Sequence, residues 1–252
     1  MSTTSEPPVI LVTGAAKRVG AEIGRTLHAA GAKLLLHYRA SADAAEALAA
    51  ELNAARPGSA ACAPADLRDT AQLPRLVAVA IEKFGRLDAL VNNASSFYAT
   101  PIGSIAEADW QDLIGSNLKG PLFLAQAAAP HLRATRGAII NITDIHAERP
   151  LKNYPLYCAA KAGLLGLTRA LALELAPEVR VNAVAPGPIA WPDGAAAADF
   201  DAATRSAIIA RTFLQREGSP GDVARTVRFL LFDAPYVTGQ VINVDGGRSL
   251  FL

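Results

Sequence analysis

Short apolar runs alternate with longer amphipathic stretches along nearly the whole chain, and this alternation limits the fold more than any other feature. Runs of this length predict buried strands, and stretches with a helical period predict helices. The expected strands are Val9–Val12, Leu34–His37, Ala60–Ala63, Ala89–Asn92, Ala138–Ile142, Val179–Val184 and Gln240–Val244. The expected helices are Gly20–Ala30, Ala42–Ala55, Ala71–Phe84, Asp109–Leu132, Tyr157–Leu175 and Pro220–Phe232. Such alternation predicts an α/β domain with a seven-stranded parallel sheet and helices on both faces.

The composition fits one globular domain and excludes several other classes. The chain has 252 residues, 51% of them hydrophobic and 19% charged, and its formal net charge of +1 indicates no nucleic-acid surface. Two cysteines do not make a disulfide framework, and no run reaches the roughly 18 apolar residues of a membrane span. Residues 1–8 lack a signal-peptide pattern and are expected to form a disordered tail before a domain of residues 9–252. We therefore expect a cytoplasmic protein without a metal site.

An irregular segment, PGPIAWPDGAAAADF, follows the sixth expected strand and runs from Pro186 to Phe200. Its three prolines and two glycines oppose any regular element. Because ligands of open α/β sheets bind beyond the carboxyl ends of the strands, we expect a substrate loop near residues 186–215. An ordinary long surface loop is the alternative.

The stretch TGAAKRVG, from Thr13 to Gly20, has the character of a phosphate-binding turn. It follows the first expected strand and opens the first helix, where free N–H groups and a partial positive charge attract a pyrophosphate. Gly14 permits the sharp turn, and Gly20 permits the close approach of the helix. Arg18, with Val19 beside it, stands where a middle glycine is common, and its guanidinium could reach round to the phosphate.

The residues that end the second expected strand favour NADPH over NADH as the cofactor. A carboxylate usually stands there when the ribose carries free hydroxyl groups. This chain instead has His37, Tyr38, Arg39 and Ser41, which could bind a 2′-phosphate. The alternative is that Arg39 is a solvated surface residue and the cofactor is NADH.

Two further strand ends offer polar groups to the same cofactor. Asp66 and Leu67 follow the third strand, where a carboxylate can accept a hydrogen bond from an adenine amino group. Asn93, Ala94 and Ser95 follow the fourth strand, where small polar groups and open backbone suit the ribose. Each group alone could cap a loop, but their shared position at strand ends favours a cofactor site.

Tyr157 and Lys161 lie four residues apart on an expected helix and so share one of its faces. A lysine close to a tyrosine lowers the phenol pKa, which would make Tyr157 a proton donor or acceptor near neutral pH. Asn117 stands inside another expected helix, where asparagine is unfavourable, and could mark a kink that holds a water linked to Lys161. The alternative for Tyr157 and Lys161 is a chance pair on an exposed helix face, and the alternative for Asn117 is a polar residue that the helix tolerates.

Together these motifs resemble the short-chain dehydrogenase/reductase family. The TGAAKRVG turn, NNA, the mid-helix asparagine, Y-x-x-x-K and the PG after the sixth strand occur in the family's order, and the match covers essentially Val9 to Gly247. The resemblance implies a single-domain Rossmann fold, a nicotinamide cofactor and hydride transfer. It also implies cofactor contacts from Pro186, Gly187 and Ile189, and a homotetramer formed through alanine- and leucine-rich helices.

Position 144 departs from that family. Most members have a serine thirteen residues before the catalytic tyrosine, where it bonds the substrate's carbonyl oxygen, but this chain has Asp144. A carboxylate there would oppose a developing alkoxide. It suits instead the relay of a proton to a ring nitrogen, or the acceptance of bonds from ring N–H and amino groups. The alternative is that Asp144 only caps the loop before His146.

A narrower resemblance is to the pteridine reductases within that family, carried by Arg18, HYR, NNASSFY, Asp144, Tyr157 and Lys161. It implies that Phe97 stacks on a pterin and that Arg18 contacts both cofactor phosphate and substrate. The irregular segment adds Pro188 and Trp191, although Trp191 could equally anchor the loop. The expected substrate set is Arg18, Ser95, Phe97, Asp144, Tyr157, Pro188 and Trp191, and the expected catalytic set is Asp144, Tyr157, Lys161 and Asn117.

These interpretations lead to one main hypothesis and two others. The sequence predicts an NADPH-dependent reductase of dihydropterins or dihydrofolate that adds hydride to a C=N bond. The second hypothesis is a short-chain carbonyl reductase that acts on 3-oxoacyl thioesters or small ketones. The third is a non-catalytic dinucleotide sensor, against which the intact pair of Tyr157 and Lys161 argues.

Overall fold

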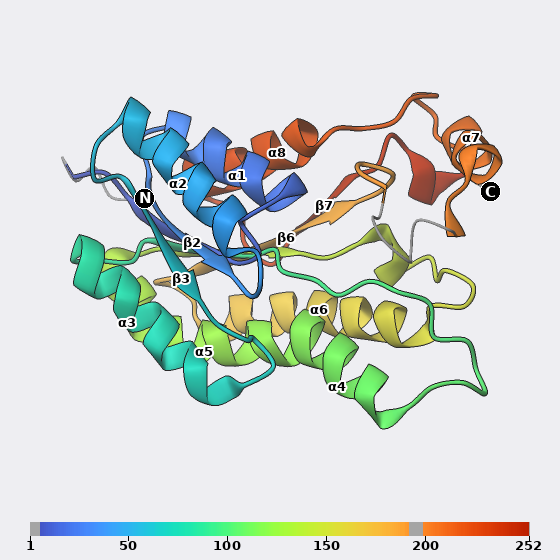
Figure 1. The fold of residues 1–252 in the computed structure, drawn as a ribbon, viewed down its shortest axis with the longest axis horizontal. Helices are drawn as coiled ribbons and strands as arrows, with labels where there is room; N and C mark the ends of the chain where they lie inside the picture. Colours follow the sequence, from blue (N-terminus) through green and yellow to red (C-terminus); the bar gives the residue numbers. More distant parts are fainter. Residues whose placement is uncertain (1–5, 192–198, 252) are drawn as a thin grey trace.

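Seven parallel strands form one sheet at the centre of the protein (Figure 1). The structure, a computed structural model, describes residues 6–191 and 199–251. The sheet order is β3-β2-β1-β4-β5-β6-β7, and every neighbouring pair is parallel. The predicted α/β fold is confirmed, and each strand lies within two residues of its expected position. The strands are β1 (Val9–Val12), β2 (Lys33–Tyr38), β3 (Ala60–Pro64), β4 (Ala89–Asn92), β5 (Ala138–Ile142), β6 (Arg180–Pro186) and β7 (Val241–Val244).

Helices cover both faces of the sheet, with α1, α2 and α8 on one face and α3, α5 and α6 on the other (Figure 1). Successive side chains of a strand point to opposite faces, so β1 sends Ile10 and Val12 into the first layer and Val9 and Leu11 into the second. This explains why the strands are apolar throughout rather than alternating. The helices are α1 (Arg18–Ala29), α2 (Ala42–Ala55), α3 (Leu73–Phe84), α4 (Glu107–Ile114), α5 (Gly120–Thr135), α6 (Pro155–Glu174), α7 (Ala202–Ala210) and α8 (Pro220–Phe232).

The stretch expected as one helix over Asp109–Leu132 is helical throughout, but a π-helical turn at Gly115–Lys119, which contains Asn117, where the sequence suggested a kink, separates α4 from α5. Two local features explain the break. Asn117 donates its side-chain amide to the Leu113 carbonyl and thereby competes with the backbone ladder. Pro121 lacks a backbone N–H, and in a regular helix its ring would clash with the carbonyl four residues earlier. Single π-helical turns inside helices are frequent at functional sites.

The expected disordered tail of residues 1–8 is only partly open to comparison, because residues 1–5 lie outside the described residues. Glu6 forms an ion pair with Arg86 at 3.3 Å, and the Pro8 carbonyl accepts a hydrogen bond from the Lys33 N–H. Residues 6–8 therefore contact the fold, and the disorder of the tail stays a prediction.

The expected substrate loop near residues 186–215 likewise falls partly outside the described residues, at 192–198. Its described part contains α7, which the sequence analysis did not anticipate. Asp201 caps this helix by accepting a hydrogen bond from the Thr204 N–H at 2.7 Å. A short helix without a strong apolar stripe gives little periodic signal, which explains the omission.

Within the described part of the chain, α6 is long and apolar enough to cross a membrane by length and composition alone. Half of the apolar stretch of this helix is buried inside the fold. The helix carries Tyr157 and Lys161, both buried, and it packs below the sheet (Figure 1). These are the properties of a core helix of a globular domain.

Candidate active site

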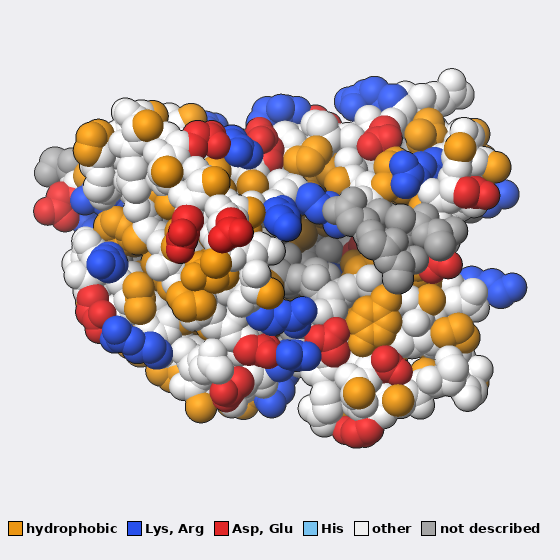
Figure 2. Space-filling model, viewed as in Figure 1, with side chains coloured by type: hydrophobic (Ala, Val, Ile, Leu, Met, Phe, Trp, Pro, Cys, Tyr) orange, Lys and Arg blue, Asp and Glu red, His pale blue; other side chains and the backbone are white. Residues whose placement is uncertain are grey.

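A cavity of about 680 Å³ lies beyond the carboxyl ends of the strands. In Figure 2 this face of the molecule is hollowed near its centre, with Lys and Arg side chains gathered beside the hollow. The cavity walls contain every predicted site residue except Asn117. Asn117 is buried and contacts Ser95 and Ser96, which line the cavity. The predicted residues in the walls are Gly14, Arg18, Val19, Gly20, His37, Tyr38, Arg39, Ser41, Asp66, Leu67, Asn93, Ala94, Ser95, Phe97, Asp144, Tyr157, Lys161, Pro186, Gly187, Pro188, Ile189 and Trp191.

The turn between β1 and α1 requires its two glycines for different reasons. Gly14 has a left-handed φ of +61°, a conformation that glycine adopts without strain. A Cβ atom on Gly20 would lie 2.2 Å from the Gly14 carbonyl oxygen, so the helix could not approach the turn. The Asn93 side chain donates to the carbonyls of Thr13 and Gly14 at 2.9 and 3.1 Å, which fixes the turn against the end of β4.

Arg18 opens α1 with a left-handed φ of 52°, which is costly for a residue with a side chain. Its Nη2 atom donates to the carbonyls of Ala190 and Trp191 at 2.9 and 2.7 Å. Strained backbone of this kind persists where surrounding contacts hold it, and such positions gather at ligand sites. Arg18 thus links the turn between β1 and α1 to the segment after β6, and it lines the cavity.

His37 has a different role from the phosphate ligand that the sequence suggested. Its Nδ1 atom accepts from the Gly14 N–H at 3.1 Å, and its Nε2 atom contacts the Ala65 carbonyl at 3.0 Å. Both ring nitrogens are therefore used inside the protein, and burial lowers the pKa of the imidazole. A neutral ring held in this way braces the turn and cannot act as a cation for a phosphate.

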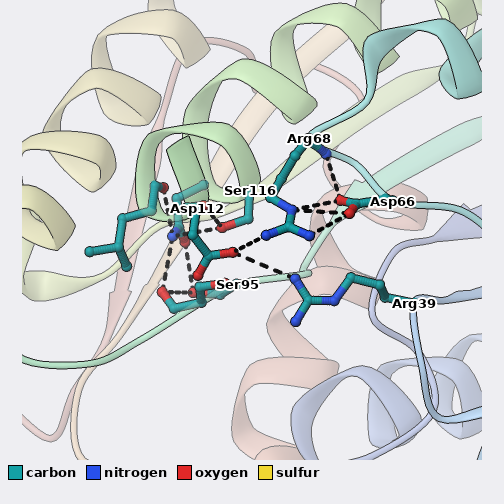
Figure 3. Close-up of polar contacts among 9 residues, drawn as sticks. Arg39, Asp66, Arg68, Ser95, Asp112 and Ser116 are labelled. Carbon is teal, nitrogen blue, oxygen red and sulfur yellow. Dashed lines mark hydrogen bonds and ion pairs between the residues drawn. The ribbon is translucent and has the colours of Figure 1, made fainter. Parts of the chain in front are cut away.

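Four charged side chains form a cluster at the β2 and β3 ends of the cavity (Figure 3). Arg68 binds Asp66 through Nε and Nη2, with the shortest contact at 2.6 Å, and this pairing lowers the pKa of Asp66 to about 2. Asp112 of α4 lies between Arg68, at 3.1 Å, and Arg39, at 3.5 Å. No motif in the sequence predicted Arg68 or Asp112 as part of the site, because only the packing of α4 brings Asp112 beside Arg39 and Arg68.

Tyr157 and Asp144 are in direct contact at the opposite end of the cavity. The tyrosine hydroxyl donates to Asp144 Oδ2 at 2.6 Å, while Asp144 Oδ1 accepts from the His146 N–H at 2.8 Å. Asp144 is therefore both a cap and a partner of the tyrosine. Burial raises the pKa of Tyr157 well above its usual value, and the neighbouring carboxylate raises it further. The expected lowering of this pKa by Lys161 is wrong, because burial and Asp144 raise it, and the phenol is protonated.

Lys161 is 2% exposed, and its ammonium donates to the Ile142 carbonyl at 2.9 Å. Burial lowers the pKa of the amine to about 8, although the Asp144 carboxylate partly opposes this effect. Its Nζ atom lies 5.7 Å from the centre of the Tyr157 ring. The lysine and the tyrosine thus share the predicted face of α6, but the lysine binds backbone rather than the phenol oxygen.

Asn117 connects the π-helical turn to the end of β4. Its Oδ1 atom accepts from the Ser95 hydroxyl at 2.7 Å, and its amide donates to the Ser96 carbonyl at 3.0 Å (Figure 3 labels Ser95). The Ser95 side chain acts on the Tyr157 phenol as well and lowers its pKa, against the larger effects of burial and Asp144. The asparagine therefore holds the segment that runs past the tyrosine, and its predicted link through water to Lys161 stays a prediction.

Comparison with known proteins assigns the chain to a family. A family model described as enoyl-(acyl carrier protein) reductase matches residues 14–249. The chain belongs to the short-chain dehydrogenase/reductase family. Pteridine reductase 1 of Leishmania tarentolae is 40% identical over 99% of both chains. A 3-oxoacyl-[acyl-carrier-protein] reductase of Synechocystis sp. is 38% identical over 96% of this chain and 97% of its own.

This short-chain dehydrogenase/reductase is therefore an oxidoreductase whose relatives use a nicotinamide cofactor. A further relative, the 3-oxoacyl-[acyl-carrier-protein] reductase FabG of Staphylococcus aureus, is 37% identical over 95% of this chain and 97% of its own. Two different activities thus occur among relatives of nearly equal identity, so identity alone does not select the substrate.

Four aromatic rings, of Phe97, Tyr154, Phe200 and Trp191, form a wall beside Tyr157. Phe97 stacks on Tyr154 with ring centres 4.7 Å apart and meets Tyr157 edge-on at 4.8 Å. Phe200 lies 6.1 Å from Phe97 and 5.8 Å from Trp191. Phe97 is thus partly packed into protein, as well as exposed to the cavity. The wall gives one end of the cavity the flat apolar surface that an aromatic ligand needs.

Trp191 and Tyr154 are also tied to the segment around α7. The Trp191 indole N–H donates to Glu217 at 2.9 Å, and the Arg205 guanidinium lies 5.3 Å from the centre of the indole ring. The Tyr154 hydroxyl donates to Asp199 at 2.6 Å. Trp191 therefore anchors the loop as well as lining the cavity, so both interpretations made from the sequence describe part of its surroundings.

The donor groups in the cavity suit a nicotinamide dinucleotide. The amino end of α1 offers backbone N–H groups, and Arg18 stands beside them. Arg39 and Ser41 line the far end, and Lys161 lines the end near Tyr157. Among residues 6–191 and 199–251, no group of three or more His, Cys, Asp or Glu side chains is arranged to hold a metal ion.

Proposed function

We propose that this oxidoreductase uses NADPH to reduce pterins, such as a dihydropterin or dihydrofolate, at a C=N bond. The observation that carries the proposal is the contact between Asp144 and the protonated Tyr157 at 2.6 Å. A carboxylate at this place is unfavourable next to an oxygen that becomes an alkoxide. It is favourable next to a heterocycle whose ring N–H and amino groups donate hydrogen bonds. The 40% identity to Pteridine reductase 1 of Leishmania tarentolae supports the same choice.

In the proposed reaction, bound NADPH supplies the hydride and the protein supplies the proton. The Tyr157 ring meets Phe97 of the aromatic wall edge-on, and its hydroxyl donates a hydrogen bond to Asp144, which holds it in one orientation. After the phenol has given up its proton, Asp144 passes a proton from solvent water to the phenolate and so restores the phenol. The Lys161 ammonium holds the cofactor ribose and stabilises the phenolate that forms. Asn117 keeps Ser95 in place beside the phenol.

The substrate is proposed to lie against Phe97, with Ser95, Asp144 and Tyr157 on its polar edge and Pro188 and Trp191 at the mouth of the cavity. Arg18 reaches the same region from the phosphate-binding turn. At the other end, Arg39 and Ser41 bind the 2′-phosphate of the cofactor and Asp66 accepts from the adenine amino group. The cavity of about 680 Å³ has the size of a site for small molecules.

Replacing Asp144 with serine separates this proposal from its main competitor. The competitor is a reductase of 3-oxoacyl thioesters or small ketones, which the 38% identity to the Synechocystis sp. enzyme favours. NADPH oxidation is followed at 340 nm with dihydrobiopterin, dihydromonapterin and dihydrofolate, and with an acetoacetyl thioester. For a pterin reductase, Asp144→Ser lowers kcat/KM for the dihydropterins about 100-fold or more, because the proton relay and the substrate acceptor are lost together.

The opposite pattern favours the competitor. If the unmodified protein turns over only the thioester, and Asp144→Ser keeps or raises that rate, the pterin proposal is wrong. No oxidation of NADPH with any of these substrates, although NADPH binds, would point to a dinucleotide sensor instead.

The proposal includes a cytoplasmic homotetramer. Apolar side chains are exposed on α5, where Leu122 and Phe123 are 38% and 37% exposed, and on α6, where Leu173 is 83% exposed. Exposed apolar surface of this kind marks interfaces between subunits. Light scattering that returned the mass of a single chain, 26.2 kDa, would contradict the tetramer.

A further inference from the structure

Asp112 stands where two arginines compete for one carboxylate (Figure 3). It lies on α4, and its side chain is 19% exposed. Arg68 approaches it at 3.1 Å and Arg39 at 3.5 Å. Burial, and after it the carboxylates of Asp112 and Asp109, raise the pKa of Tyr98 to about 12. Asp112 therefore acts as a negative charge on groups from three separate segments.

The two arginines are not held equally. Arg68 is already bound to Asp66 by Nε and Nη2, and its Nη1 makes a hydrogen bond to Asp112 at 3.1 Å. Arg39 is 53% exposed, and its contact with Asp112 at 3.5 Å is longer than a charge-assisted hydrogen bond. Of the two, Arg39 is the one that can turn toward a ligand, and it lines the cavity.

The formal charges of this cluster cancel. Arg39 and Arg68 supply two positive charges, and Asp66 and Asp112 supply two negative charges. A 2′-phosphate that approaches Arg39 therefore meets a neutral cluster, and it must draw the guanidinium from Asp112. If position 112 carried no charge, the cluster would be positive and Arg39 would have no competing anion.

We propose that Asp112 determines how strongly this protein distinguishes nucleotides with a 2′-phosphate from nucleotides without one, by competing for Arg39. The inference rests on the proposed use of NADPH. In this arrangement Asp112 weakens the binding of the 2′-phosphate and so favours release of the oxidised cofactor. An ion pair of such exposure corresponds to about two- to five-fold in a dissociation constant.

The test uses equilibrium binding rather than activity. Isothermal titration calorimetry at constant low salt compares adenosine 2′,5′-bisphosphate with adenosine 5′-monophosphate, for the full chain and for Asp112→Asn. We expect Asp112→Asn to bind the bisphosphate about two- to five-fold more tightly and the monophosphate unchanged. Unchanged binding of the monophosphate also shows that the variant is folded.

Two further variants make the result specific. Glu107→Gln removes one negative charge from the same helix, at an exposed residue that contacts Gln111 rather than Arg39, and it is expected to change neither affinity. In Arg39→Gln, the additional change Asp112→Asn is expected to have no effect on the bisphosphate, because the shared partner is gone.

Several outcomes would overturn the inference. These are weaker or unchanged bisphosphate binding in Asp112→Asn, an equal gain for the monophosphate, an equal gain in Glu107→Gln, or a gain that persists without Arg39. The NADPH proposal fails on a different result, which is equal affinity of the unmodified protein for the two probes. The two failures are therefore distinguishable in one set of titrations.

Discussion

Replacing Lys161 with methionine is expected to stabilise the ligand-free fold while it removes the chemistry of the site. Lys161 is 2% exposed, and the charge of the Asp144 carboxylate raises the pKa of its amine. Burial outweighs that attraction and lowers the pKa of the amine from 10.5 to about 8. At pH 7 the folded protein therefore holds a charged amine in a place that disfavours charge.

The size of this cost follows from the two pKa values. The difference between 10.5 and about 8, at about 1.4 kcal/mol for each pH unit, amounts to about 3 kcal/mol. Methionine fills nearly the same volume without charge, but it leaves the Ile142 carbonyl without the hydrogen bond that Lys161 donates. That loss costs about 1 kcal/mol, so the net gain in the free energy of unfolding at pH 7 is about 2 kcal/mol.

The pH dependence gives the sharper test. Between pH 8 and 10.5 the unfolded chain binds more protons at this lysine than the folded chain does, so the stability contributed by the unmodified residue rises with pH. The cost is fully present below about pH 8 and is relieved as the pH approaches 10.5. The stability advantage of Lys161→Met is therefore expected to shrink over this window.

Urea unfolding of the two proteins at fixed chain concentration, at several pH values from 7 to 10, measures this difference. Lys152→Met, at an exposed lysine, is the control and is expected to gain nothing. A Lys161→Met protein that is less stable than the unmodified one at pH 7, or an advantage that stays constant up to pH 10, would refute the reasoning.

Two other substitutions test the turn and the proton donor. Gly20→Ala places a Cβ atom 2.2 Å from the Gly14 carbonyl oxygen. We therefore expect lower thermal stability and at least tenfold weaker binding of NADP⁺, measured by calorimetry. Gly24→Ala is the control and is expected to be tolerated, because the nearest contacts of its Cβ atom would lie at 3.5 Å or more. Tyr157→Phe is expected to lower kcat about 100- to 10,000-fold with NADP⁺ binding retained, and a kcat within tenfold of the unmodified enzyme would show that another group donates the proton.

The sheet could be predicted from the sequence because its signals are local. Each strand is a short apolar run, and β1 illustrates why, since Ile10 and Val12 are buried in one layer and Val9 and Leu11 in the other. The same holds for the glycine turn, whose requirement for Gly20 arises from a contact only six residues away. Interactions that are close in sequence leave a pattern that can be recognised without the fold.

The missed features depend on contacts between distant segments. The position of His37 near the end of β2 suggested a contact with a 2′-phosphate, but the Gly14 N–H and the Ala65 carbonyl occupy its ring nitrogens. The role of Asp112 could not be predicted from the sequence of α4, because its partners Arg39 and Arg68 follow the strands β2 and β3. Neither role could be found from spacing alone, since each depends on where the packed helices and turns place the side chain.

The protonation of Tyr157 shows how such a distant contact changes the chemistry that a motif implies. The spacing of Tyr157 and Lys161 suggested a phenol with a lowered pKa, as the four-residue pair alone would give. In the fold, burial is the main cause that raises the pKa of the Tyr157 phenol. The Asp144 carboxylate, which accepts a hydrogen bond from the phenol at 2.6 Å, raises it further. Asp144, which stands where most of the family has a serine, therefore keeps the phenol protonated where the four-residue spacing alone suggested a lowered pKa.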